Sequence, residues 1–168
     1  MFDLFNGLPV HALVVHAVVV LLPLACLGTI AIAVRPSWRR TYGVLVVGCA
    51  AAATVLIPVA TSSGEELEHR VGNPGEHAEL GDQLIWFAIP LLALSLALVW
   101  IDRRQQAQAS DDQPESAASV PADRDRGRMT RVVAVLALVA ALATSVQVYR
   151  VGDSGARAAW GDRVESSH

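Results

Sequence analysis

The segment VHALVVHAVVVLLPLACLGTIAIAV, residues 10–34, contains no Asp, Glu, Lys or Arg. An α-helix needs about 20 mostly apolar residues to cross the hydrocarbon core of a bilayer. This segment therefore predicts a membrane-spanning helix. We interpret it as a retained helix rather than a cleaved signal peptide, because residues 1–9 carry Asp3 and no Arg and the apolar run is longer than a signal sequence uses.

Three further segments have the same character, at residues 42–61, 84–101 and 132–149. All 13 basic and all 16 acidic residues of the 168-residue chain lie outside the four segments. Runs of this length exclude an ordinary soluble domain and a transmembrane β-barrel, whose strands alternate over about 10 residues. The sequence therefore predicts an all-α fold, a four-helix transmembrane bundle that forms a single membrane domain over residues 1–168.

The connections between these segments differ in length and character. Residues 35–41 predict a tight basic turn, and residues 62–83 predict a polar, acidic loop. Residues 102–131 contain no hydrophobic cluster, so they cannot bury enough apolar surface to offset the entropy lost on ordering. We therefore expect a disordered linker over about residues 105–126.

The distribution of arginine predicts the orientation in the membrane. Most arginines lie in the first and third connections, and the residues before the first segment contain none. Because cytoplasmic loops carry the excess of Lys and Arg, we expect both termini to be extracytoplasmic and the linker to be cytoplasmic. The net charge of −3, without a basic patch, argues against a nucleic-acid partner.

Small residues indicate where the helices pack. In the fourth segment Ala137, Ala141 and Thr144 recur at helical spacing, which lets two backbones approach closely in lipid. Cys26 and Cys49 fall at a similar depth in their segments, and we expect them to act as small apolar residues.

The histidines form the most informative group of polar residues. His11, His16, His69 and His77 all fall near the predicted extracytoplasmic face. His16 lies about 9 Å inside its segment, at about 1.5 Å per residue, where an ionisable group is costly and marks a candidate functional site. A neutral histidine bonded to a neighbouring carbonyl is the simpler alternative. His11 and His16 project about 140° apart on an ideal helix, so they do not both reach one small ion.

Two acidic stretches accompany these histidines. If the second helix continues through residues 64–69, Glu66 and His69 form a Glu-x-x-His pair on one face, a spacing found in carboxylate-bridged metal sites. Only one such pair is present, so an exposed acidic helix end is the simpler interpretation. Residues 74–82, PGEHAELGD, predict the start of the third helix with acidic residues in its first turns, and His77 and Asp82 remain candidates to face the bundle.

Two functions are consistent with these residues. The favoured one is a non-catalytic membrane module that uses a His/carboxylate cluster for packing, pH response or partner docking. No motif for nucleophilic catalysis or phosphate binding is present, which argues against an enzyme. The alternative is an electron-transfer protein that binds haem b or a transition metal, with His11, His16 and His77 as the haem candidates. The candidate metal ligands are His11, His16, Glu66, His69, His77 and Asp82.

Residues 7–16, GLPVHALVVH, resemble the His-Pro-x-x-Val-His signature of the bacterial family called domain of unknown function 2231. Residues 64–71 with 77–82, and residues 151–160, resemble its actinobacterial members. The resemblance implies a small multi-pass protein of the bacterial plasma (inner) membrane with about four helices and no assigned activity. Some relatives are joined to Rieske-type iron–sulfur domains, which implies a redox membrane partner, and a homodimer is a further expectation.

The resemblance also implies that His11, His16 and His77 are functional candidates. Two positions depart from the family pattern. Ala12 stands where the family usually has Pro, which removes a helix-start signal. Asp153 stands where relatives often have His, so a site that needs a ligand at that position changes character or is lost.

Overall fold

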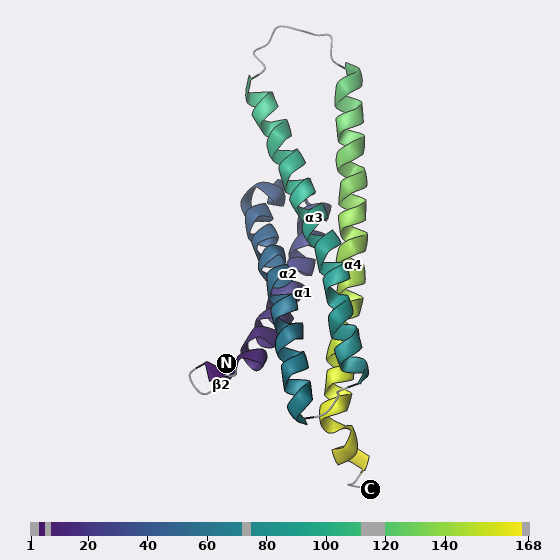
Figure 1. The fold of residues 1–168 in the computed structure, drawn as a ribbon. Coiled ribbons are helices and arrows are strands. Elements are labelled where there is room, and N and C mark those ends of the chain that lie inside the picture. Colours follow the sequence, from purple (N-terminus) through teal and green to yellow (C-terminus); the bar gives the residue numbers. More distant parts are fainter. Residues whose placement is uncertain (1–3, 6–7, 72–74, 112–119, 166–168) are drawn as a thin grey trace.

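Four helices arranged as an antiparallel bundle make up the described part of this computed structural model (Figure 1). Their bounds are α1 (Val10–Val34), α2 (Ser37–Val71), α3 (Glu76–Asp111) and α4 (Val120–Glu165). Two two-residue strands, β1 (Leu4–Phe5) and β2 (Leu8–Pro9), pair antiparallel ahead of α1. The structure describes the backbone over residues 4–5, 8–71, 75–111 and 120–165, and the side chains over residues 13–65, 75–108 and 127–157.

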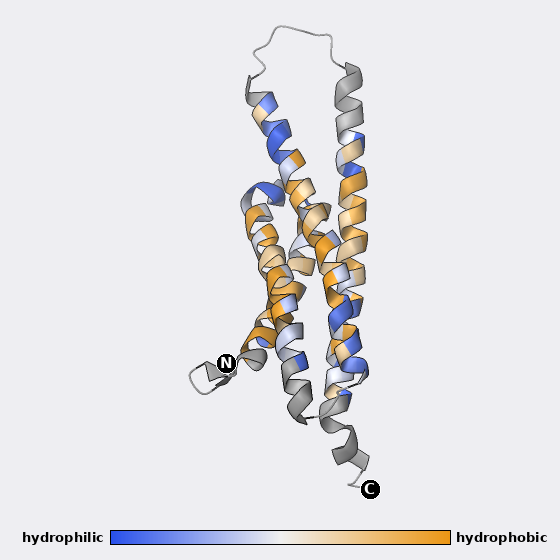
Figure 2. Ribbon diagram, viewed as in Figure 1, coloured by the Kyte–Doolittle hydropathy of each residue, from blue (hydrophilic) through white to orange (hydrophobic). Residues whose placement is uncertain are grey.

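All four helices are long and apolar enough to cross a membrane. The qualifying stretches are Leu13–Val34, Ser37–Glu65, Glu76–Gln108 and Gly127–Arg157. Hydrophobic residues dominate the middle of the bundle, and hydrophilic residues gather toward its two ends (Figure 2). The predicted all-α bundle of four membrane-spanning helices is therefore confirmed.

The helices run further than the charge-free segments indicate. α2 starts at Ser37 and continues to Val71, so the turn before it is reduced to residues 35–36 and most of the expected acidic loop is helical. A helix is free to continue past its membrane-spanning part, because its backbone hydrogen bonds are made within the segment itself. Lack of charge therefore predicts the span but not the end of the helix.

Part of the predicted disordered linker is helical at each of its two ends. α3 ends at Asp111 and α4 begins at Val120, so residues 105–111 and 120–126 are helical, while residues 112–119 lie outside the described part of the chain. The local reason is the composition, because Ala, Gln and Arg are good helix formers. The amide of Gln105 also donates to the hydroxyl of Thr130, at 3.0 Å, which joins α3 to α4 beyond the apolar spans.

Small residues fill the contacts between helices, as the sequence predicts. Ala137, Ala141 and Thr144 of α4 are fully buried. Gly28 of α1 lies so close to α2 that a Cβ there would sit 2.6 Å from Cγ2 of Val46. Without a side chain at position 28, the two backbones approach closely where lipid supplies no hydrophobic drive for association.

One buried arginine, Arg39 of α2, connects its own helix to α1 and α3 at the end of the bundle where α1 turns into α2. Nε of Arg39 donates to the carbonyl of Ile32 at 2.8 Å, and a terminal guanidinium nitrogen donates to the carbonyl of Ala33 at 3.3 Å. The last carbonyls of a helix have no partner within the helix, so the guanidinium satisfies groups that would otherwise face lipid. Arg39 also lies 3.7 Å from the carboxylate of Asp102 on α3.

Candidate functional site

A series of hydrogen bonds connects α3 to α4 through the membrane-spanning region. The amide of Gln147, which is only 2% exposed, donates to the carbonyl of Leu80 at 3.1 Å. The hydroxyl of Thr144, which is fully buried, shares its single proton between the carbonyl of Ala140 in its own helix at 2.7 Å and the carbonyl of Phe87 on α3 at 3.2 Å. Such bonds fix the rotation and register of two helices in a setting without water.

His77 continues this series at the end where α2 turns into α3. Gly75 adopts a left-handed backbone with φ of 62°, which glycine tolerates without strain, and α3 starts at the next residue. This turn places His77 in the first turn of α3. Nδ1 of His77 lies 3.1 Å from the carbonyl oxygen of Val151 and 3.2 Å from Oγ of Ser154, both on α4.

The surroundings of His77 determine which ring nitrogen carries the proton. The carbonyl oxygen of Val151 can only accept, so its hydrogen bond with the ring requires the proton to be on Nδ1. The hydroxyl of Ser154 donates to the same carbonyl at 2.9 Å, and its oxygen is then available to accept from Nδ1. In the neutral ring, the other nitrogen, Nε2, keeps its lone pair and is the atom that can take a proton or a metal ion.

Gly155 supplies the space that the imidazole occupies. A Cβ at this position would lie 2.9 Å from Cε1 and 3.1 Å from Nδ1 of His77. Real Cβ atoms do not approach ring atoms this closely, so any other residue at 155 would displace the ring. The contact therefore depends on three features of one turn of α4: the carbonyl of Val151, the hydroxyl of Ser154 and the missing side chain of Gly155.

The acidic residues near this contact remain at the surface. Glu76, Glu79 and Asp82 of α3 are exposed. Asp82, which the sequence offered as a candidate to face the bundle, therefore lies at the surface instead. Asp153 forms an ion pair with Arg157 one turn further along α4. Neither the hydrogen bonds of His77 in the described part of the chain nor its packing on Gly155 involves one of these carboxylates.

The other predicted site residues do not join the contact of His77 in the described part of the structure. His16 is exposed on α1, on the outward face of the helix with Leu13 and Val20. α2 continues through Glu66 and His69, which meets the condition for a Glu-x-x-His pair on one helix. The side chains of His11, Glu66 and His69 lie outside the described residues. Among the side chains that the structure describes, no three His, Cys, Asp or Glu residues come close enough together to hold a metal ion.

The two cysteines belong to the core. Cys26 and Cys49 are both buried and are part of one apolar cluster shared by the four helices. Their surroundings agree with the expected role as small packing residues.

Sequence reasoning identified His77 but missed its partners. The amide of Gln147 within a charge-free segment was the available signal for an interhelical bond, since such a group requires a partner in lipid. Ser154 and Gly155 gave no comparable signal, because their role depends on how α4 is rotated toward α3.

Comparison with known proteins gives one match. No curated protein and no solved structure matches the chain. The model of a family described as "Predicted membrane protein (DUF2231)" matches residues 7–168, which is nearly the whole chain and includes all four helices. The protein therefore belongs to this family of membrane proteins.

Proposed function

We propose that the protein is a non-catalytic membrane module with a pH-dependent docking edge at the end of the α3–α4 pair. This docking edge consists of His77 at the start of α3 and of Val151, Ser154 and Gly155 on α4. The observation that carries this proposal is the donation of Nδ1–H of His77 to the carbonyl of Val151. This bond uses a proton that the imidazole holds in both of its protonation states. The ring therefore keeps its place on α4 while the charge at Nε2 changes.

The charge change gives the docking edge two chemical forms. The neutral, half-buried ring accepts hydrogen bonds at Nε2, and the protonated ring donates them there as a cation. Charged groups at this end include Glu76, which precedes His77 on α3, and the paired Asp153 and Arg157 of α4; Glu76 and Asp153 both attract Arg157. On α2, Glu65 is the last acidic side chain described toward this end. A partner that presents a carboxylate would bind the form in which the imidazole is protonated and positively charged.

A pH titration of the imidazole nitrogens tests this proposal. Protein labelled with ¹⁵N-histidine in lipid nanodiscs is followed by NMR, and the His77 signals are assigned with a His77→Gln variant. We expect Nε2 to titrate while Nδ1 stays protonated and the amide signals of residues 151–155 stay in place. Release of α4 on titration, seen as large shifts of those amides, would contradict a docking edge that changes charge without moving.

Binding of haem b or a transition metal is the second candidate function. One observation favours it: a histidine that ligates a metal usually gives its other N–H to a carbonyl or carboxylate, as Nδ1 of His77 does. Nε2 of His77 would be the ligand, with His11 on α1 as the second haem ligand, since His16 lies on the outward face of α1, and with a redox membrane protein as the partner. An absorption spectrum and metal analysis of the purified protein test it, and the absence of both a Soret band and stoichiometric metal would overturn it.

We further propose that the docking edge is extracytoplasmic in a bacterial plasma membrane. At the opposite end of the bundle, exposed arginines surround the α1–α2 turn and the α3–α4 extension, which supports a cytoplasmic location for that end. They are Arg35, Arg40, Arg103, Arg104, Arg128 and Arg131. Fusing a reporter that is active only outside the cytoplasm after residue 168 tests the orientation, and an inactive reporter in an expressed, membrane-inserted fusion would contradict it.

A further inference from the structure

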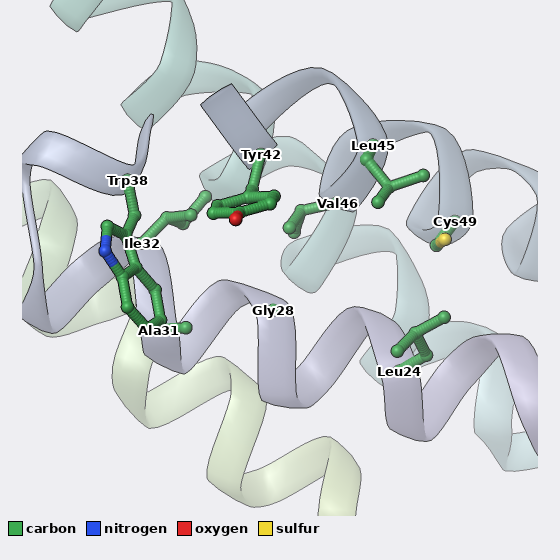
Figure 3. A pocket seen from close by; sticks show the side chains of 9 residues that line it. All are labelled: Leu24, Gly28, Ala31, Ile32, Trp38, Tyr42, Leu45, Val46 and Cys49. Carbon is green, nitrogen blue, oxygen red and sulfur yellow. The ribbon is translucent and has the colours of Figure 1, made fainter. Parts of the chain in front are cut away.

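An apolar groove runs along the surface between α1 and α2, far from His77. Its volume is about 220 Å³. Figure 3 shows Trp38 of α2 against Ala31 of α1 at one end, and Leu24 and Cys49 at the other. Over this distance α2 rises by about 16 Å, at about 1.5 Å per residue, so the groove is long and narrow. All of its lining residues are apolar or aromatic.

The end of the groove that Trp38 lines lies at the edge of the membrane-spanning region. The span of α1 ends at Val34 and that of α2 starts at Ser37, so Arg35 lies between the two spans. Trp38 and Tyr42 pack edge to face at this point, with ring centroids 5.9 Å apart. Aromatic residues of this kind mark the boundary between lipid tails and headgroups.

A positive charge stands at this end of the groove. The guanidinium of Arg35 is exposed and lies 5.0 Å from the ring centroid of Trp38. Arg40 is also exposed in the first turn of α2, whereas Arg39 is buried and engaged with Asp102. An apolar groove with an exposed cation at its headgroup end matches a molecule with one long apolar chain and one anionic head.

We propose that this groove binds one anionic phospholipid, with an acyl chain between α1 and α2 and the phosphate headgroup at Arg35. Charge complementarity favours an anionic lipid over two other occupants. A zwitterionic lipid would bring the cation of its headgroup toward Arg35, and a second copy of the protein would bring its own Arg35 toward this one. Basic residues at the ends of membrane helices attract anionic headgroups in this way. The bound lipid would fasten the α1–α2 hairpin on the side that Arg39 does not reach.

Native mass spectrometry of the full chain tests the proposal, using equal amounts of phosphatidylglycerol and phosphatidylcholine with the same acyl chains. We expect the protein to retain one molecule of phosphatidylglycerol in preference to phosphatidylcholine. Arg35→Gln lowers that preference about fivefold, the effect of one basic residue near an anionic lipid surface. Arg35→Lys keeps it, and Ala31→Leu, which fills the groove, lowers retention of the lipid.

Arg104→Gln is the matched control, because Arg104 is also exposed and lies over a boundary aromatic, Trp100, at 3.7 Å, but lines no part of this groove. Circular dichroism and a single elution peak confirm that each variant is folded. Equal retention of the two lipids by the wild type would overturn the proposal, as would equal effects of Arg35→Gln and Arg104→Gln. A dimer that Ala31→Leu disrupts, without lipid preference, would assign the groove to a second copy and overturn it as well.

Discussion

The imidazole of His77 occupies the space above Gly155, where a Cβ would come within 2.9 Å of ring atom Cε1. The two residues belong to the first turn of α3 and the last part of α4 whose side chains the structure describes. The missing side chain at 155 lets the ring reach the carbonyl of Val151, which fixes its proton on Nδ1. Packing at one glycine thus decides the chemistry available at the docking edge.

Replacing Gly155 with Ala tests this packing. The added methyl group meets the imidazole, so we expect Gly155→Ala to lower the free energy of unfolding by about 1–3 kcal/mol relative to a control glycine, as overpacking does. The control is Gly152→Ala, because a Cβ at this exposed position of the same helix meets nothing within 4 Å. Thermal unfolding in detergent, followed by circular dichroism, measures both. Equal stability of the two variants would show that the ring does not rest on Gly155.

The bond from Gln147 to Leu80 should contribute measurably to the α3–α4 contact. Gln147→Leu keeps the volume and removes the donor, and we expect a loss of about 0.6–1.7 kcal/mol, the range found for interhelical hydrogen bonds in membranes. Equilibrium unfolding in a denaturing detergent measures it. An unchanged or higher stability would mean that apolar packing at position 147 serves the bundle equally well.

The buried Arg39 should be far more important than its neighbour Arg40. Arg39→Gln leaves the carbonyls of Ile32 and Ala33 without their donor and Asp102 without its ion-pair partner, while Gln106 still donates to the Asp102 carboxylate. Because Asp102 remains 16% exposed, we expect a loss of about 2–3 kcal/mol, below the range for a fully buried pair. Arg40→Gln, at an exposed position, should change stability by less than about 0.5 kcal/mol. Similar losses of stability in the two variants would contradict the role of Arg39 in connecting α1, α2 and α3.

The close approach of α1 and α2 at Gly28 predicts a compensating pair of substitutions. Gly28→Ala brings a methyl group to 2.6 Å from Val46, so we expect it to destabilise the bundle by about 1–3 kcal/mol. Adding Val46→Ala removes the clash and should recover part of that loss. Thermal unfolding of the single and double variants measures the coupling. Additive effects of the two substitutions would place Gly28 and Val46 out of contact.

The sequence predicts the spans well because the physics of a membrane span is local. Charge cannot be buried in lipid without cost, so the charge-free segments at residues 10–34 and 132–149 predict where helices cross. The ends of α3 and α4 were harder to predict, because residues 105–111 and 120–126 have a composition that suits both a disordered chain and a helix supported by a neighbour.

The candidate site was predictable only as a set of residue types. His77 is recognisable as a polar residue near a helix start without a capping role. Its partner Val151 lies 74 residues away, and only the relative rotation of α3 and α4 brings them together. The same holds for Asp82, which the sequence leaves free to face the bundle and which the rotation of α3 places at the surface.

The most direct test of the account is the proton on His77 and its bond to α4. NMR of protein in lipid nanodiscs, with ¹⁵N-histidine and ¹³C-carbonyl valine labels, detects the one-bond coupling of Nδ1 to its proton and the coupling across the hydrogen bond to the Val151 carbonyl. In the neutral form of the ring we expect a protonated Nδ1, an unprotonated Nε2 and a correlation between Nδ1 and the Val151 carbonyl. A ring protonated at Nε2 alone, without that correlation, would contradict the central claim that His77 is held on α4 by Nδ1–H.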